Sequence, residues 1–479
     1  MPSKYDVDIQ EIVSFISCID DKDKCKAQQM ICIDAFTKQT GESYLDDRAE
    51  FIRESMNTHL ELADAFERLS ATCTGEYINS CERCLVRKYC NTYILQKRLD
   101  SAKDMCMIDL FCGAGGLSLG FVQAGFYAAL ANDIEPCCVD TYAHNHPETP
   151  RDHIILGDIR DVVVDLEKLM DSKTVDVVVG GPPCQGFSTA NRQRLIDDPR
   201  NYLYKNYIEV VKKLQPKFFV MENVKGMLGV SDQVKEDFKQ IGYTVECKVF
   251  NAKDFGVPQN RERLIYIGNR IGADNITLIE EIDAIADSSK PHVLKDALLG
   301  LRPLEASRKR NATEEDSDIS GKKIESNSSP ETNDYIESIN EGQVIKVVCN
   351  HKARYNNDRD IEIFGRLDQG DRSDDPKIAD IMPYTRRSNI FKDKYYKLEE
   401  NKVCKTITAH MKFDCNMYIH PTQARGLTPR EAARVQSYPD DYFFRGAYTK
   451  TYMQIGNSVP PLLGRAIATV VKKYIDEDE

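Results

Sequence analysis

The chain has 479 residues, 41% of them hydrophobic and 29% charged, and its formal net charge is -12 at pH 7. This length allows about three domains of ordinary size, and the composition excludes a chain that is mainly disordered or fibrous. No apolar run approaches the roughly 18 residues that cross a bilayer, and the first residues lack the pattern of a secretory signal. We therefore expect a globular, cytoplasmic protein with no membrane partner, in which a local basic surface could still bind a polyanion.

Residues 1–103 are predicted to form a small helical domain, because charged and apolar residues recur there at helical spacing. The domain ends in a loop, 73–90, that contains Cys73, Cys81, Cys84 and Cys90. Cysteines of a cytosolic chain stay reduced, so their clustering indicates a metal site rather than disulfides. Four thiolates suit a [4Fe–4S] cluster or zinc, and the alternative is a helical hairpin without metal.

From Met105 onward, short apolar segments alternate with helical stretches. This alternation predicts an α/β fold whose mostly parallel sheet is covered on both faces, over residues 104–290. The next stretch, 291–421, has an irregular pattern of short strands, and within it residues 305–334 have almost no apolar content, so we expect a mobile insertion there. Helical patterning resumes over 422–479, with a Thr428-Pro429 helix start, and this part is expected to complete the α/β domain.

Three successive strand ends carry residues that suit a nucleotide-like cofactor. The run from Asp109 to Gly116, DLFCGAGG, follows an apolar strand and opens a helix, so its glycines would let the backbone approach a ligand. Asn132-Asp133 follows the next strand, in the place of the acid that binds ribose hydroxyls in dinucleotide folds, and Asp158 follows a third. A tight turn and two helix caps would explain the same residues separately, but their place at one sheet edge favours a cofactor cleft.

Candidate catalytic residues follow the next strands. Cys184 lies in GGPPCQGFS, where two prolines stiffen a strand end and favour an exposed, nucleophilic thiolate over a buried thiol. Glu222 ends the strand FFVMENV, where it either caps a helix or has a shifted pKa and acts as an acid. In PQNRERL, alternation places Gln259, Arg261 and Arg263 on one side of a strand, unless this is a solvated strand end.

The motifs resemble those of DNA cytosine-5 methyltransferases. FCGAGG, GGPPCQGFS, MENV, QNRER, RGLTPREAARVQSYPD and QIGNSVPP occur in the family's order over residues 104–479. The resemblance implies a Rossmann-like fold that binds S-adenosylmethionine, and a cytosine flipped out of duplex DNA. It also implies that 291–421 is a target-recognition domain, with these candidate base readers: Arg354, Arg386, Arg387, His410 and Lys412.

The resemblance assigns roles that suit the chemistry. The Cys184 thiolate would add to C6 of cytosine, Glu222 would give a proton to N3, and Arg263, with Arg261 near it, would hold O2. Residues 185–203, with Arg192, Arg194 and Arg200, resemble a mobile loop that closes over DNA and contacts phosphates.

The implied cofactor pocket draws on several strand ends, and its Ile134 replaces an aromatic residue found in other members. Phe111, Gly113, Gly115 and Gly116 line the methionine side, Asp133 binds the ribose, Ile134 packs the adenine, Asp158 and Ile159 reach the adenine edge, Gly181, Pro183 and Leu203 close the pocket, and Asn457, Ser458 and Val459 complete it.

The four-cysteine loop is similar to the iron–sulfur loop of endonuclease III-type DNA glycosylases and differs by one residue in the first gap. This similarity favours a [4Fe–4S] cluster over zinc. Arg83, Arg87 and Lys88 lie within the loop, so we expect a structural module that touches DNA.

The sequence therefore predicts an S-adenosylmethionine-dependent DNA cytosine-5 methyltransferase of a restriction-modification system. We expect a monomer that acts on duplex DNA at the nucleoid, with a restriction endonuclease encoded separately. One alternative is a tRNA cytosine-5 methyltransferase, but the Cys-Phe-Thr motif of that branch is not found in the recognition region. The other is a non-catalytic DNA-binding regulator, which would have little use for Cys184, Glu222 and Arg263 together.

Overall fold

The computed structural model describes residues 105–478, apart from 147–148, 150, 171–173, 184–202, 311–314, 327–330, 344, 346 and 384–393. Several predictions fall outside the described residues. They concern the helical domain 1–103 with Cys73, Cys81, Cys84 and Cys90, the thiol of Cys184, and the arginines Arg192, Arg194, Arg200, Arg386 and Arg387. Among the residues that are described, no helix combines the length and apolar character needed to span a membrane.

A seven-stranded sheet with the order β3-β2-β1-β4-β5-β7-β6 forms the centre of the molecule. Its neighbouring strands are parallel from β3 to β5, and β7 runs antiparallel to both β5 and β6. This arrangement confirms the predicted mostly parallel sheet. The strands are β1 (Cys106–Leu110), β2 (Tyr127–Asp133), β3 (Ile154–Leu156), β4 (Val177–Gly180), β5 (Phe218–Asn223), β6 (Thr244–Asn251) and β7 (Glu262–Asn269).

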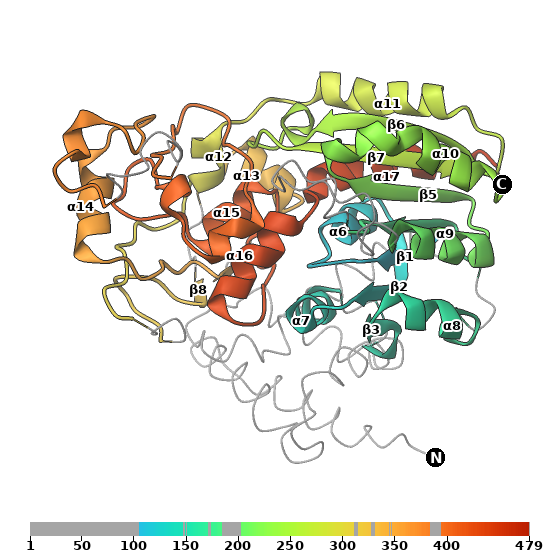
Figure 1. The fold of residues 1–479 in the computed structure, drawn as a ribbon, viewed down its shortest axis with the longest axis horizontal. Coiled ribbons are helices and arrows are strands. Elements are labelled where there is room, and N and C mark those ends of the chain that lie inside the picture. The colour runs from blue at the N-terminus through green and yellow to red at the C-terminus, as the bar shows by residue number, and fades with distance from the viewer. Residues whose placement is uncertain are drawn as a thin grey trace, which may run out of the picture.

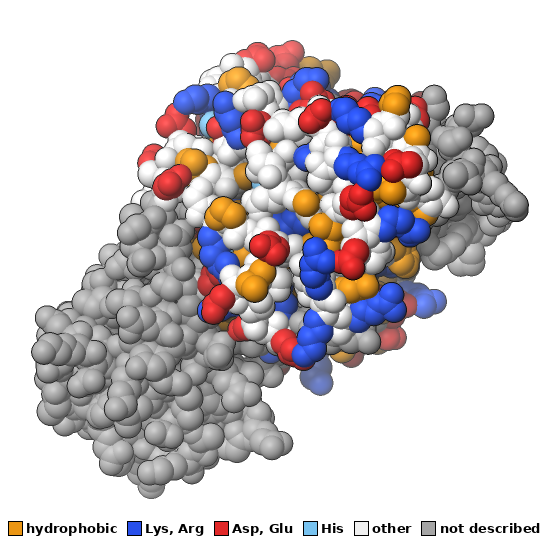
Figure 2. Space-filling view, turned by 90° about the vertical axis from the view of Figure 1, so that its left-hand side faces the viewer, with side chains coloured by type: hydrophobic (Ala, Val, Ile, Leu, Met, Phe, Trp, Pro, Cys, Tyr) orange, Lys and Arg blue, Asp and Glu red, His pale blue; other side chains and the backbone are white. Residues whose placement is uncertain are grey.

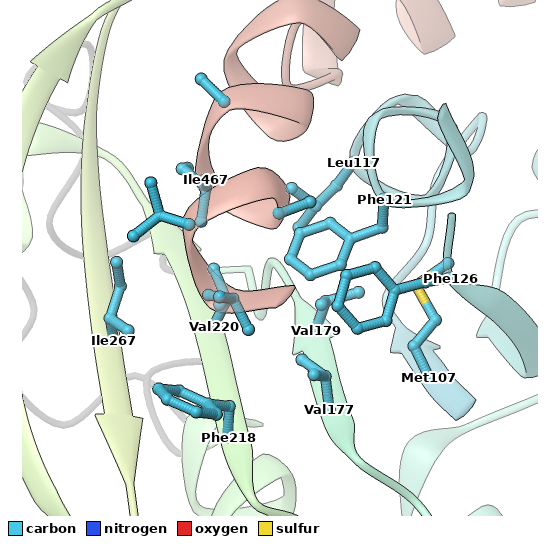
Figure 3. Close-up of a cluster of buried hydrophobic side chains, with 14 of the residues drawn as sticks. Met107, Leu117, Phe121, Phe126, Val177, Val179, Phe218, Val220, Ile267 and Ile467 are labelled. Carbon is cyan, nitrogen blue, oxygen red and sulfur yellow. The ribbon is translucent and has the colours of Figure 1, made fainter. Parts of the chain in front are cut away.

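Helices cover both faces of this sheet (Figure 1). On one face α6 (Gly116–Gln123), α11 (Asn275–Ser288) and α17 (Pro461–Asp476) pack on alternate strand residues such as Val179. In Figure 3, Phe121 and Phe126 point toward this apolar layer. The other face packs residues such as Val178 against α8 (Ile159–Met170), α9 (Leu203–Leu214) and α10 (Ser231–Lys239). The strands are therefore apolar throughout because successive side chains enter opposite cores.

The order of the strands reverses between β1 and β4. From β1 the chain passes through α6 to β2 and through α7 (Pro136–Asn145) to β3, and it then crosses back to β4 and β5 on the other side of β1. In open α/β sheets, ligands bind outside the carboxyl ends of the strands at such a reversal. The fold therefore places a binding site beyond the ends of β1, β2, β4 and β5.

The remainder of the chain forms a second apolar core, beside the sheet. It contains Tyr335, Ile407, Met411, Ala433 and Tyr452, so residues from both sides of the predicted boundary at 421 pack together. This part of the chain contains α12 (Leu294–Leu298), α13 (Asp334–Ile339), α14 (Asp358–Arg366), α15 (Pro429–Val435), α16 (Tyr448–Asn457) and the hairpin of β8 (Ile324–Ser326) with β9 (Val347–Cys349). Ile363 and Phe364 of α14 belong to a separate, smaller apolar cluster. Short 3-10 helices are η3 (Arg151–His153), η5 (Lys225–Val230), η6 (Ala252–Phe255), η7 (Pro376–Ile378), η8 (Ala409–Lys412) and η9 (Asn416–Tyr418).

The structure differs from the expectation that residues 305–334 form a mobile insertion. Within this stretch, β8 pairs with β9, and the side chains of Ile324 and Glu325 are buried. Arg302 Nε lies 2.7 Å from Glu325 Oε2 and balances the buried charge. The low apolar content hid this order because its partners, β9 and Arg302, lie outside the stretch.

The contact between α6 and α17 provides a test of the packing. A Cβ atom at Gly120 would lie 2.5 Å from the Pro461 carbonyl oxygen and 2.5 Å from the Arg465 backbone nitrogen. Gly120→Ala should lower the free energy of unfolding by about 1–3 kcal/mol, although alanine ordinarily stabilises a helix. Gly365→Ala in α14 is the matched control, because a Cβ there meets nothing within 4 Å. Urea unfolding measures both, and equal effects of the two substitutions would contradict this packing.

Candidate active site

The glycine turn between β1 and α6 has a backbone that few side chains tolerate. Gly113 has a φ of 54° and Gly115 a φ of 78°. A Cβ at Gly115 would lie 2.6 Å from His146 Nε2, and a Cβ at Gly116 would clash with Ser458 and Val459. Ser458 and Val459 therefore lie against the glycine turn, as the sequence predicts for the returning C-terminal segment.

Asp133 lies at the carboxyl end of β2 and binds the glycine turn. Its Oδ2 accepts a hydrogen bond from Gly113 N at 2.8 Å, and its Oδ1 accepts one from Glu135 N at 2.8 Å. Burial raises the pKa of this carboxyl above its ordinary value, and the two N–H donors oppose that effect. The turn and the acid thus form one unit, which suits the ribose contact predicted for Asp133.

Two large apolar side chains lie exposed next to this acid. Ile134 is 66% exposed, and Leu156, the β3 residue paired with Asp133, is 52% exposed. Apolar surface beside a carboxylate at a sheet edge suits a ring that carries a ribose. Ile134 was predicted for this role, whereas Leu156 was missed; its signal was its place as the last residue of an apolar strand at the same edge.

Asp158 and Ile159 have other partners in the structure. The Asp158 carboxylate accepts hydrogen bonds from Arg160 Nε at 2.8 Å and Arg160 Nη2 at 2.6 Å. These bonds lower the pKa of Asp158 to about 2. The Ile159 side chain is 2% exposed and packs in the core under α8. Both side chains thus have structural contacts at the start of α8. For Asp158, a role at a helix start was the alternative explanation that the sequence offered.

The turn after β4 is fixed to the end of β5. Asn223 Nδ2 donates a hydrogen bond to the Pro182 carbonyl oxygen at 3.0 Å. A Cβ at Gly181 would lie 2.9 Å from Glu222 Oε2, so only glycine leaves this carboxylate its space. Pro183 is exposed and Leu203 is half-buried at the start of α9. The turn therefore directs the chain toward Cys184 from a point beside Glu222.

Glu222 and Arg263 form an ion pair at this edge, with 2.7 Å between Glu222 Oε1 and Arg263 Nε. The exposed fractions of the two side chains are 13% and 14%. Burial raises the pKa of Glu222, although Arg263 and Arg261 oppose the shift. A carboxyl with a raised pKa is suited to donate a proton near neutral pH.

Arg261 lies close enough to Glu222 to oppose the rise in the pKa of that carboxyl, as expected of a residue near Arg263. Its side chain is fully buried and donates hydrogen bonds to the Ile407, Gly456 and Ser458 carbonyl oxygens at 2.7, 2.9 and 2.6 Å. The alternation predicted along PQNRERL is present, because Gln259 and Arg261 are buried and Arg263 is half-buried, whereas Asn260 and Glu262 are exposed. Arg261 therefore fastens the C-terminal region to the sheet and leaves Arg263 as the arginine of the site.

The candidate base readers fall into two groups. Arg354 donates hydrogen bonds to the Met411 and Phe413 carbonyl oxygens at 3.0 and 2.9 Å, so it supports a loop and does not project toward a ligand. His410 and Lys412 belong to η8, on that loop. Figure 2 shows the end of the molecule that carries α14, where basic and acidic side chains are interspersed.

Asp109 is a buried carboxyl beneath the glycine turn that the sequence did not single out. It is 1% exposed, and its Oδ2 accepts a hydrogen bond from Ser118 Oγ at 2.6 Å. The same Ser118 Oγ lies 2.8 Å from Tyr142 Oη. Burial raises its pKa to about 7. Asp109 is therefore largely protonated in weakly acidic solution and supports the turn as a neutral group.

None of the described cysteines forms a disulfide, and no group of three or more His, Cys, Asp or Glu side chains within the described part of the chain could hold a metal. The residues that are brought together instead fit an organic cofactor. A buried carboxylate, a glycine turn and exposed apolar side chains match the ribose, the methionine part and the adenine of S-adenosylmethionine.

The mostly parallel sheet with its reversed strand β7, together with the family match given next, identifies this protein as an S-adenosylmethionine-dependent methyltransferase. The sequence pattern of C-5 cytosine-specific DNA methylases matches residues 105–473, and the chain belongs to that family. It is a DNA cytosine methyltransferase.

Known proteins resemble the chain over most of its length. The Type II methyltransferase M1.HphI of Haemophilus parahaemolyticus is 35% identical over 404 residues, which cover 81% of this chain and 92% of that protein. The Type II methyltransferase M.AgeI of Thalassovita gelatinovora is 32% identical over 432 residues, with 78% and 100% covered. A prophage-encoded protein of E. coli, provisionally assigned as a DNA modification methyltransferase, has a crystal structure with a TM-score of 0.61 at 26% identity, covering 78% of this chain and 99% of that one.

The raised pKa of Asp109 predicts how stability depends on pH. The folded state keeps a proton up to about pH 7, whereas the unfolded chain releases it near the ordinary value of 3.8. Asp109 therefore makes stability fall as pH rises through this window, by up to about 1.4 kcal/mol per pH unit. Asp109→Asn cannot lose the proton, so its stability relative to the wild type should increase from pH 5 to pH 7.

Urea unfolding at several pH values measures this difference. Asp165→Asn, at an exposed position on α8, is the control and should follow the wild-type profile. Parallel profiles for Asp109→Asn and the wild type would show that Asp109 is not held protonated.

Proposed function

We propose that this enzyme methylates C5 of a flipped-out cytosine, in a specific sequence of duplex DNA, through a covalent bond between Cys184 and C6 of the base. The observation that carries the proposal is the Glu222–Arg263 ion pair, which lies beside the turn that leads to Cys184. A cytosine ring under nucleophilic attack needs a proton donor for N3 and a positive charge near O2. The acid and the cation of this pair match these two needs.

The reaction needs the ring to become nucleophilic at C5. Cys184, as a thiolate, forms a bond to C6, and the displaced electron pair is accommodated as Glu222 gives its proton to N3. Arg263 stabilises the charge that develops at O2, and its ion pair keeps the Glu222 carboxyl in place. C5 then takes the methyl group, a base removes the C5 proton as the bond to Cys184 breaks, and N3 returns its proton to Glu222. This leaves 5-methylcytosine, the free thiolate and the demethylated cofactor.

S-adenosylmethionine, when bound, supplies the electrophilic methyl group. Asp133 would hold its ribose, and Ile134 and Leu156 would cover its adenine from the exposed edge. Phe111, Gly113, Gly115 and Gly116, with Asn457, Ser458 and Val459 against the turn, would enclose the methionine part. Asp158 and Ile159 would contribute through their backbone, since their side chains have other partners.

M1.HphI and M.AgeI, named above, are Type II methyltransferases, which supports a role as the modification enzyme of a restriction-modification system. The proposal includes a separately encoded restriction endonuclease as counterpart, a monomeric chain and a location at the nucleoid, where the substrate lies. Residues 291–421 would read the DNA sequence from the major groove. The tRNA alternative lacks its motif, Cys-Phe-Thr, in that region.

Radiolabelled methyl transfer tests the proposal with duplex DNA and tRNA offered separately. Wild-type protein should label duplex DNA only, and bisulfite sequencing should locate 5-methylcytosine in one recognition sequence. Cys184→Ala should lose transfer but keep DNA binding, and Glu222→Gln should be slower by about 100- to 10,000-fold.

Cys247→Ala is the matched control, because Cys247 is a free, half-buried thiol on the edge strand β6 and should be dispensable. Transfer by Cys184→Ala at the rate of this control would refute the covalent mechanism. Labelling of tRNA by the wild type would favour the alternative substrate.

We also propose that Cys73, Cys81, Cys84 and Cys90 bind a [4Fe–4S] cluster, with zinc as the alternative, in a structural module that touches DNA. The support is the spacing of four thiols in a chain of a reducing compartment. Elemental analysis of anaerobically purified protein should find about four irons per chain, with a brown colour that the double variant Cys81→Ser/Cys84→Ser loses. Protein that contains neither iron nor zinc would end this proposal.

A further inference from the structure

The loop that follows η8 presents an exposed aromatic side chain. Phe413 is 64% exposed, whereas its neighbours Met411 and Cys415 are buried at 0% and 1%. Phe413 therefore offers an uncovered aromatic face at the tip of a well-packed loop, where burial by a ligand would be favourable.

The root of this loop is fastened to the segment that enters β7. Asn260 N donates a hydrogen bond to the Cys404 carbonyl oxygen at 2.8 Å, and Thr406 Oγ1 donates one to the Asn260 carbonyl oxygen at 2.5 Å. Arg261 continues the contact to Ile407, and Arg263 of the ion pair lies two residues further on. The loop therefore starts at the border of the proposed cytosine site.

A half-buried arginine, Arg354, holds the tip of the loop in shape. Arg354 binds the carbonyl oxygens of both Met411 and Phe413, and its Nη1 lies 3.3 Å from Cys415 Sγ. Its guanidinium carbon also lies 6.0 Å from the centre of the Tyr452 ring. One side chain thus fixes the turn on both sides of Phe413, which makes the exposure of that ring a property of the packed loop.

A lysine and a histidine lie beside the exposed ring, and Asp414 follows it in the chain. Lys412 Nζ lies 4.9 Å from the centre of the Phe413 ring, and the His410 ring lies 5.2 Å from it, centre to centre. Bases stack on aromatic side chains, and lysines neutralise phosphates. The combination of an aromatic tip with adjacent positive charge fits nucleic acid better than it fits an apolar protein partner.

We infer that Phe413 stacks on the bases next to the target cytosine and replaces stacking that is lost when this cytosine leaves the helix. The inference rests on the proposed function, because it requires an extruded base. Unstacking opposes extrusion, and aromatic wedges can stabilise such openings. Lys412 contacts the backbone at the same step, and Arg354 is a positioning residue that acts through the loop.

The experiment measures opening separately from binding. In a duplex that contains the recognition sequence, 2-aminopurine replaces the target cytosine and is paired with thymine, and its fluorescence rises when it leaves the stack. Phe413→Ala should shift the opening equilibrium toward the closed state by about 5- to 150-fold, the range of one base–aromatic stack. Phe413→Trp should open the target as the wild type does.

Two controls separate stacking from damage to the loop. Ile276→Ala removes an apolar side chain of similar exposure, 59%, from α11 and should not change opening. A mispaired target makes extrusion cheaper, so opening by Phe413→Ala should recover on that duplex, and its binding of S-adenosylmethionine should match the wild type.

If the Phe413→Ala variant opened the target base as far as the Ile276→Ala variant does, the inference would be overturned. A loss that neither Phe413→Trp nor the mispaired duplex repairs would also overturn it, because it would show a structural role for the ring. Failure of the proposed function has a different signature, in which the wild-type protein itself does not open the target.

Discussion

The antiparallel direction of β7 is the constraint on which the site depends. β1, β2, β4 and β5 all end at one edge of the sheet, whereas β7 begins there because it runs the other way. Pairing of Asn223 with Leu264 places Arg263 next to Glu222. If β7 were parallel to β5, its first residue would lie at the opposite end of the strands, about 20 Å away for a strand of ordinary length. Acid and cation therefore meet because of topology, although 40 residues separate them in the sequence (263 minus 222, less one).

Buried arginines hold the C-terminal region together, and one of them, Arg261, also joins it to the segment that enters β7. Arg261 binds three backbone carbonyl oxygens, Arg425 pairs with Glu431 at 2.6 Å, and Arg434 pairs with Asp440 at 2.5 Å. Burying a charged group is costly unless it is paired and hydrogen-bonded. These arginines therefore favour the one arrangement of the chain that supplies their partners. This requirement links the glycine turn, the Glu222 site and the loop of Phe413: Arg261 contacts Ile407 before that loop and Ser458 beside the turn. The cofactor side and the DNA side thus share one set of polar contacts.

The sequence predicted the sheet well and its details less well. Apolar runs identified the strands, and the rule that parallel strands end at one edge correctly gathered Asp133, Gly181 and Glu222 there. Alternation placed Arg261 and Arg263 on one side of the chain, but it could not show that the hydrogen bonds of Arg261 go to carbonyl oxygens of distant segments. The order of residues 315–326 could not be read from their own composition, since β9 and Arg302 stabilise them from outside. Leu156 was overlooked because exposure at a strand end depends on the neighbouring turn.

The central step of the proposed mechanism is the formation of a covalent bond between Cys184 and the target base. DNA synthesised with 5-fluorocytosine in place of cytosine tests it in any sequence, because fluorine at C5 blocks the final loss of a proton and leaves the protein attached. With S-adenosylmethionine present, we expect a complex that survives denaturation, and peptide mass spectrometry should locate the bond at Cys184. Attachment through another residue, or no attachment by a protein that methylates ordinary DNA, would contradict the mechanism.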